Sequence, residues 1–373
     1  MRTELQDARR VVVKLGTHIL TGADGRMAVP RLRSLVRQCA RLAGEGRSVI
    51  LVSSGAVGLG RKVLGIDASG DVTARQACAA VGQSLLMEEY QRLFARHGRT
   101  VAQLLVTAGD FADRRRYLTL KGTFERLLSY GVIPIVNEND SVSTMELEED
   151  ARTNSFGDND LLSALVASKL GADLLLNLTN VDGIYDSNPH ENANARLLPE
   201  LDDFEVVRKL GLKGQSAYGR GGVSSKIEAA RLASFGGVHT IISSGLRSNA
   251  ILDCRGTLVR SRLKLSERKR WIGLSSGYGG VLVVNDGAAE ALLRKNASLL
   301  PAGIVDVRGR FRAQEVVSVE TSDGREIGRG IVHFAADEVR KIRGCHSREI
   351  AGRLDRNARK QVIHRDHLVI FGE

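Results

Sequence analysis

The feature that most constrains the fold is a regular alternation of two apolar patterns between Val11 and Gly245. Short apolar runs predict buried strands at residues 11–16, 48–52, 100–106, 132–136, 173–178 and 238–245. Helical periodicity lies between them, at residues 31–46, 74–97, 114–130, 159–170 and 224–237. Strands that alternate with helices form a mostly parallel sheet covered on both faces, so this part is predicted to be an α/β domain.

The pattern changes after Gly245. Residues 259–271 are rich in charge and indicate a linker or an exposed helix. From Gly279 onward, short β-branched runs separated by glycine turns predict a small β-barrel domain. We therefore expect a catalytic domain at 1–258, a linker at 259–276, a barrel domain at 277–355 and a basic tail at 356–373.

Composition agrees with a globular protein of the cytoplasm. Hydrophobic residues make up 43% and charged residues 26% of the 373 positions. No run approaches the roughly 18 apolar residues of a membrane span, and the N-terminus lacks the apolar stretch of a signal peptide. Because no apolar run is long enough to span a membrane, no membrane partner is expected. The four cysteines form no CxxC pair and no zinc spacing, so reduced thiols are expected.

The positive charge is concentrated in the last third of the chain. Net charge is +11, and from Arg255 onward there are 23 Lys and Arg against 14 Asp and Glu. Such an excess indicates either a polyanionic partner such as RNA or an ordinary basic surface, and charge alone leaves both open.

Two clusters of carboxylates and carboxamides follow the apolar patterns at places where α/β proteins bind ligands. Asn137-Glu138-Asn139-Asp140 ends a predicted strand, and Gly157-Asp158-Asn159-Asp160 begins a predicted helix. Ligands of open α/β sheets lie at the carboxyl ends of the strands, so both clusters are candidate binding groups. The alternative is that these residues only end a strand and cap a helix.

Three small-residue loops and two lysines favour phosphate chemistry. The loops are Gly16-Thr17, Ser53-Ser54-Gly55 and 219–225, and none has the spacing of a standard phosphate-binding motif. Backbone N–H groups in such loops bind phosphate, although each could be a simple turn. Lys14 ends a buried strand and Lys226 lies in the first turn of a helix, where a cation gains nothing from the helix dipole. Two such lysines suit phosphoryl transfer, while solvent-facing lysines are the other interpretation.

Six motifs in order resemble the amino acid kinase superfamily and, within it, the glutamate 5-kinase family. They are VVVKLGTHIL, LVSSGA, VNENDSVS, FGDND, LTNVDGIYDSNP and GRGGVSSKIEAA, and they span about Val11 to Gly245. Residues of about 277–355 resemble the PUA domain that many bacterial members of this family carry. The resemblance implies an αβα sandwich and ATP-dependent phosphorylation of the γ-carboxylate of L-glutamate, the first step of proline synthesis, with Mg²⁺.

The resemblance also implies roles for individual residues. Lys14 and Lys226 would flank the transferred phosphoryl group, and Asp160, with Asp158 as a further candidate, would orient the lysines or a metal. Ser54, Asp140 and Asn159 would hold glutamate. The ATP-binding residues would be Lys14, Thr179, Asn180, Arg220, Gly221, Gly222, Val223, Ser224, Ser225 and Lys226. No metal ligand is assigned.

The sequence departs from the family pattern at three nucleotide positions. Asn180 stands where Asp is expected, and Arg220 and Ser225 stand where Thr is expected, which affects the adenine and ribose contacts more than the reaction. Family membership further implies proline as feedback inhibitor and a homo-oligomer. The residues leave open another amino acid kinase, such as acetylglutamate or uridylate kinase, and an RNA-binding protein acting through the PUA-like domain. The acidic insert 145–155 is predicted to be either a mobile lid or a passive surface loop.

Overall fold

The computed structural model describes residues 2–22, 24–68, 70–142, 159–189, 192, 194–201, 222–261, 266–274, 279–346, 348–354 and 360–371. These residues form two compact units, Met1–Lys264 and Leu265–Glu373. Among the described residues, no helix is both long enough and apolar enough to cross a membrane. The acidic insert 145–155 lies outside the described residues.

The first unit is built on a seven-stranded sheet in the order β3-β4-β2-β1-β5-β6-β7. The strands are β1 Arg10–Leu15, β2 Ser48–Ser53, β3 Val101–Val106, β4 Ile133–Glu138, β5 Leu174–Thr179, β6 His239–Ser244 and β7 Thr257–Val259. Only the β6–β7 pair is antiparallel. The predicted mostly parallel sheet is confirmed.

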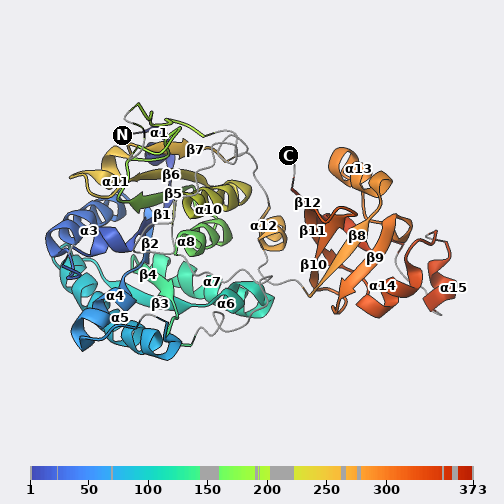
Figure 1. Ribbon diagram of the computed structural model, residues 1–373, viewed down its shortest axis with the longest axis horizontal. Helices are drawn as coiled ribbons and strands as arrows, with labels where there is room; N and C mark the ends of the chain where they lie inside the picture. Colours follow the sequence, from blue (N-terminus) through green and yellow to red (C-terminus); the bar gives the residue numbers. More distant parts are fainter. Residues whose placement is uncertain are drawn as a thin grey trace. The chain divides into compact units, whose positions relative to one another are not determined.

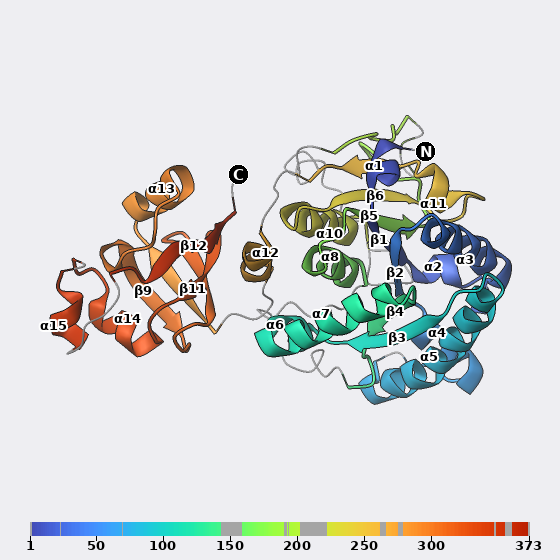
Figure 2. The same ribbon diagram turned by 180° about the vertical axis from the view of Figure 1, so that it is seen from behind.

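Helices cover both faces of this sheet, which gives the predicted three-layer αβα arrangement (Figures 1 and 2). One face carries α2 Thr17–Leu20, α3 Val29–Gly44, α4 Ala56–Leu64, α5 Val72–Ala95 and α11 Ala250–Asp253. The other carries α6 Ala108–Ala112, α7 Arg114–Ser129, α8 Asn159–Lys169 and α10 Val223–Phe235. A short helix, α1 Thr3–Asp7, precedes β1.

Alternation of side chains along β1 assigns its residues to the two layers. Val11, Val13 and Leu15 enter the core cluster that also contains residues of α3 and α5. Because successive side chains of a strand point to opposite faces, Val12 and Lys14 face the layer of α8 and α10. A lysine therefore points into the helix layer next to the carboxyl end of the central strand.

Helix α4 corrects the expectation of a small-residue loop after residue 52. The loop is only Ser54-Gly55, and residues 56–64 are helical. Its glycines hide the helical pattern in the sequence because glycine is a poor helix former. Gly60 is required by packing, since a Cβ there would lie 1.8 Å from the carbonyl oxygen of Cys78 in α5.

The second unit contains a five-stranded, mostly antiparallel sheet in the order β12-β11-β10-β8-β9. The strands are β8 Gly280–Val284, β9 Ile304–Gly309, β10 Val316–Thr321, β11 Glu326–Val332 and β12 Ile363–Ile370. The helices are α12 Glu267–Gly273, α13 Asp286–Lys295, α14 Ala336–Ile342 and α15 Ile350–Leu354, with a 3-10 turn at Pro301–Gly303. An isolated antiparallel bridge joins Leu299, which precedes the 3-10 turn, to Ile363 of β12. The predicted small β domain is present.

Two of the expected boundaries need correction. Val259 belongs to β7 of the first unit, and residues 267–273 of the expected linker form α12, which packs on β11 and β12. Residues 363–370 of the expected tail form β12 and pair with β11. The sequence does not predict this strand because HRDHLVI alternates polar and apolar residues only weakly.

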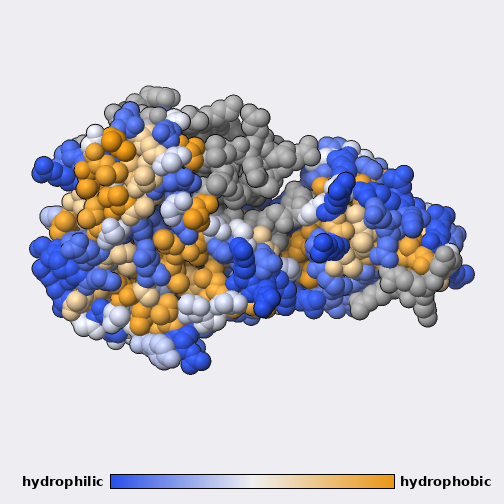
Figure 3. Space-filling view, turned by 90° about the horizontal axis from the view of Figure 1, so that it is seen from below, coloured by the Kyte–Doolittle hydropathy of each residue, from blue (hydrophilic) through white to orange (hydrophobic). Residues whose placement is uncertain are grey.

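The surface of the first unit mixes apolar and polar side chains, as the view from below shows (Figure 3). Large apolar residues with substantial exposure include Val63, Leu64 and Ile66 around the C-terminal end of α4. The four cysteines are free and buried. Burial raises the pKa of the Cys39 thiol to about 12, so this thiol stays protonated and unreactive.

Candidate active site

A buried charge cluster lies where β1 meets the N-terminal turns of α8 and α10. Asp160, in the first turn of α8, is fully buried. Its Oδ1 accepts a hydrogen bond from Lys14 Nζ, and its Oδ2 lies 3.1 Å from Lys226 Nζ. Only 5% of the Lys14 side chain and 9% of the Lys226 side chain are exposed. One carboxylate therefore holds two ammonium groups side by side.

Two further polar groups donate hydrogen bonds to Asp160. Asn177 Nδ2 donates to Oδ1 at 2.9 Å, and Ser225 Oγ donates to Oδ2 at 3.3 Å. Asn177 is the residue of β5 paired in register with Lys14 of β1, which explains how both reach the same carboxylate. Asn177 was not among the predicted site residues, although a polar residue inside the apolar run LLLNLT is a usable signal.

The ion pairs decide the protonation state of Asp160. Burial by itself would raise the pKa of this carboxyl, but Lys14 and Lys226 together outweigh burial and hold the pKa well below its usual range. The N-terminal end of α8 also favours a negative charge. With one carboxylate between two lysines, the cluster retains an excess of one positive charge, which suits a phosphate group.

The structure rules out the other interpretation of Lys226, that of a solvent-facing lysine. Its side chain is buried and paired with Asp160. The lysine lies in the first turn of α10, so the nearby helix end does not stabilise its charge, and the carboxylate of α8 does so instead.

A second group of polar side chains adjoins the charge cluster. Asn159, the neighbour of Asp160, donates through Nδ2 to Ser54 Oγ at 3.0 Å and to Asn137 Oδ1 at 3.2 Å. Asn159 Oδ1 is buried and has no hydrogen-bond partner among the described residues. The structure thus brings Ser54 and Asn159 together, leaving a buried acceptor for a donor group of a ligand.

The remaining candidates lie at the same edge of the sheet or outside the described residues. Asp140 is half-buried in the turn after β4. Thr179, buried at the end of β5, donates to the side chain of the exposed Asn180 at 3.2 Å. Gly222 caps α10, and Val223 and Ser224 begin it. Asp158, Arg220 and Gly221 lie outside the described residues.

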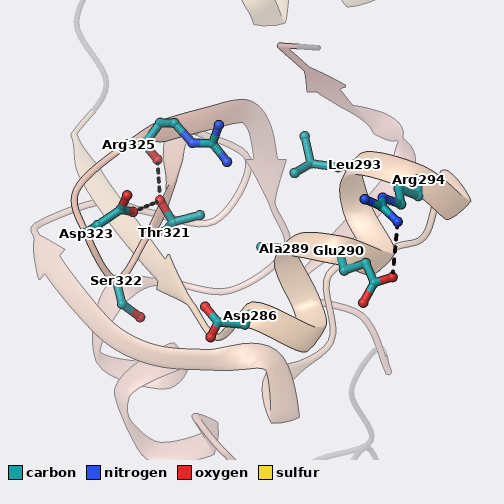
Figure 4. Close-up of a pocket in the computed structure, with 9 residues that line it drawn as sticks. All are labelled: Asp286, Ala289, Glu290, Leu293, Arg294, Thr321, Ser322, Asp323 and Arg325. Carbon is teal, nitrogen blue, oxygen red and sulfur yellow. Dashed lines mark hydrogen bonds and ion pairs between the residues drawn. The ribbon is translucent and has the colours of Figure 1, made fainter. Parts of the chain in front are cut away.

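The second unit carries a cleft of about 610 Å³ between α13 and the β10–β11 turn (Figure 4). Its lining includes the acids Asp286, Glu290 and Asp323 and the bases Arg294 and Arg325. Glu290 and Arg294 lie 3.8 Å apart and are largely exposed. Because acids outnumber bases, this cleft lacks the excess positive charge of the Lys14–Asp160–Lys226 cluster.

Comparison with known proteins gives a family match for each of the two units. Residues 9–243 match the model of the amino acid kinase family, and residues 280–354 match that of the PUA domain. The glutamate 5-kinase of Caldanaerobacter subterraneus subsp. tengcongensis is 39% identical, with 97% of this chain and 98% of the relative covered. Those of Dehalococcoides mccartyi and Geobacter sulfurreducens are both 41% identical, covering 97% and 98% of this chain and 98% and 99% of the relatives.

The matches cover both units almost from end to end. The chain therefore belongs to the amino acid kinase family, and within it to the glutamate 5-kinases that carry a C-terminal PUA domain.

Proposed function

We propose that this chain transfers the γ-phosphoryl group of ATP to the γ-carboxylate of L-glutamate, the first step of proline synthesis. The observation that carries the proposal is the full-length similarity to glutamate 5-kinases. In this reaction a carboxylate oxygen forms a bond to the γ-phosphorus while the bond to the bridging oxygen of ADP breaks. The nucleophile is already ionised at neutral pH, so the protein needs no general base.

Lys14 and Lys226 are proposed to neutralise the reacting anions. Bringing a carboxylate to a triphosphate is opposed by charge repulsion, and two preorganised ammonium groups offset it. Asp160 is proposed to hold both lysines rather than to take part in proton transfer. The support is geometric, because each Asp160 oxygen contacts one lysine.

Glutamate is proposed to lie at Ser54, Asp140 and Asn159. Asn159 Oδ1 is buried without a partner among the described residues, and an α-ammonium group would supply a donor. Asp140 would pair with the same ammonium through a charge-assisted hydrogen bond. This arrangement favours a free amino group over the acylated one of N-acetylglutamate.

ATP is proposed to bind at Thr179, Asn180 and the segment Arg220–Lys226, as its Mg²⁺ complex. Backbone N–H groups at the start of α10 suit the phosphates. Mg²⁺ generally binds through phosphate oxygens, waters and one or two carboxylates. We therefore propose that Mg²⁺ enters with the nucleotide.

Feedback inhibition by proline and a homo-oligomeric state are also proposed, on family membership. The exposed Val63, Leu64 and Ile66 are apolar side chains that a subunit contact could cover. Light scattering after gel filtration measures the oligomeric state, and proline titration of the activity measures inhibition.

Parallel assays of ADP release with L-glutamate, N-acetylglutamate, aspartate and UMP test the activity. We expect ADP formation that requires L-glutamate and Mg²⁺ and yields a hydroxamate when hydroxylamine is present. Activity confined to N-acetylglutamate or UMP would refute the proposal and favour a related kinase.

A further inference from the structure

A relay of three carboxamides connects α5 with the proposed glutamate end of the site. Asn159 Nδ2 donates to Asn137 Oδ1 at 3.2 Å, and Asn137 Nδ2 donates to Gln83 Oε1 at 2.9 Å. Asn137 and Gln83 are 2% and 7% exposed. The relay therefore runs through the interior of the first unit and ends on a helix remote in sequence from the other two residues.

A backbone group fixes the direction of this relay. The N–H of Glu138 donates to Asn137 Oδ1 at 2.9 Å, and a backbone N–H can only donate. The atom of Asn137 that faces Asn159 must therefore be the oxygen, and the atom that faces Gln83 must be the nitrogen. It follows that Asn159 turns its nitrogen toward Asn137, which leaves its oxygen as a buried acceptor without a partner among the described residues.

Close packing of two helices brings Gln83 within reach of Asn137. A Cβ on the neighbouring Gly82 would lie 1.8 Å from the carbonyl oxygen of Ala56, the first residue of α4. The absence of a side chain at Gly82 thus lets α5 approach the Ser54-Gly55 turn. Two helical turns after Gln83 in α5, the Tyr90 hydroxyl lies 2.8 Å from Ser53 Oγ.

Among the described residues, the Gln83 amide forms a hydrogen bond through its oxygen and none through its nitrogen. Gln83 Nε2 is buried and has no hydrogen-bond partner among the described residues. An unsatisfied buried donor is destabilising, so a residue that served packing alone would be better apolar. The hydrogen bond that this side chain does make is the one that its oxygen accepts from Asn137.

We propose that Gln83 is a positioning residue for glutamate binding, acting through Asn137 and Asn159. Its carbonyl oxygen holds the Asn137 carboxamide in place, and Asn137 in turn holds Asn159 with Oδ1 toward the ammonium of the substrate. The inference rests on the proposed function, since it assigns Asn159 to the glutamate end. Gln83 acts at the end of glutamate remote from the transferred phosphoryl group, so its loss weakens glutamate binding rather than ATP binding or the chemical step.

Three substitutions at Gln83 test this. Gln83→Met keeps the length and removes the acceptor, Gln83→Asn keeps an amide but shortens the side chain, and Gln83→Glu, as a buried neutral acid, keeps a carbonyl acceptor. Gln91→Met is the control, because Gln91 is exposed on the same helix. For each full-length protein, kcat and the KM values for glutamate and ATP are measured, together with the rise in Tm on adding glutamate.

With Gln83→Met and Gln83→Asn, the glutamate KM should rise about tenfold, while kcat and the ATP KM change less than about twofold. Gln83→Glu should restore most of the glutamate affinity, and Gln91→Met should match the unaltered chain. The two impaired variants should also need more glutamate to reach the same rise in Tm.

Failure of the inference and failure of the proposed function are distinguishable. An unaltered chain without glutamate-dependent ADP release refutes the function. An active chain refutes the positioning role if Gln83→Asn keeps the normal glutamate KM, if the ATP KM rises equally, or if Gln83→Glu is as impaired as Gln83→Asn. Should Gln83→Met not fold, Gln83→Asn and Gln83→Glu still decide between these outcomes.

Discussion

Asp160 and Lys226 form a buried ion pair, Oδ2 to Nζ at 3.1 Å, between the first turns of two helices separated by 66 positions in the chain. The other oxygen of the same carboxylate binds Lys14. Removing one member of such a cluster changes both the charge of the site and the stability of the fold, so activity and unfolding must be measured separately.

Lys226→Met should lower kcat by at least about 100-fold, roughly 2.7 kcal/mol, as expected for one preorganised contact to the transition state. Because Lys226 is buried against Asp160, the variant should also lose about 1–3 kcal/mol of unfolding free energy. Steady-state kinetics and urea denaturation measure the two effects. Lys62→Met, on the exposed surface of α4, is the control. A normal kcat in Lys226→Met would mean that Lys226 has a purely structural role.

Asp160→Asn should destabilise the first unit by about 3–5 kcal/mol, since two buried lysines lose their shared counter-ion. The pKa of Asp160 is lowered in the folded chain. As the pH falls below the ordinary aspartate pKa of about 3.9, the unfolded chain therefore takes up a proton at this side chain before the folded chain does. The stabilisation is therefore complete above that pH and is lost as the pH falls further. Urea denaturation between about pH 5 and 2 should show a shallower pH dependence in Asp160→Asn than in the unaltered chain; equal slopes would contradict the assignment.

Asp140→Asn should raise the glutamate KM strongly and leave the ATP KM nearly unchanged, because one partner of a charge-assisted hydrogen bond to the ammonium is lost. Initial-rate measurements with each substrate varied in turn test this. An unchanged glutamate KM would show that another group recognises the ammonium.

Gly60→Ala should destabilise the chain by about 1–3 kcal/mol, because its Cβ would meet the carbonyl oxygen of Cys78 at 1.8 Å. Gly58→Ala, in the same helix, meets nothing within 4 Å and should stabilise the chain by roughly 0.5–1 kcal/mol. Thermal unfolding of both variants gives the comparison. Equal effects would mean that α4 and α5 are not in close contact at Gly60.

A shortened protein of residues 1–264 should fold and retain kinase activity, because these residues form one compact unit with its own core. Circular dichroism and the ADP-release assay with glutamate test this proposal of separable units. Inactive or insoluble protein would mean that the C-terminal unit is needed to complete the kinase.

Local sequence patterns determined the parallel strands of the sheet, the long helices α3, α5, α7, α8 and α10, and the charged ends of the strands. Lys14 stands out in VVVKLG and Asn177 in LLLNLT because a polar residue inside an apolar run is visible without any partner. Helix α4 was missed because Gly58 and Gly60 weaken its local signal, and β12 because its alternation is poor. Both elements form through packing and pairing with distant residues, which a local pattern does not contain.

Tertiary structure alone decided which groups meet at the site. The burial of Lys226 depends on Asp160, which α8 holds opposite it. The orientation of the Asn159 carboxamide depends on Glu138 and Gln83, which fix the orientation of the Asn137 carboxamide. Gln83 carries no local signal, since a glutamine within a helical pattern is ordinarily a surface residue. Its function follows from the close approach of α4 and α5, because hydrogen-bond direction is set by the partners that packing supplies.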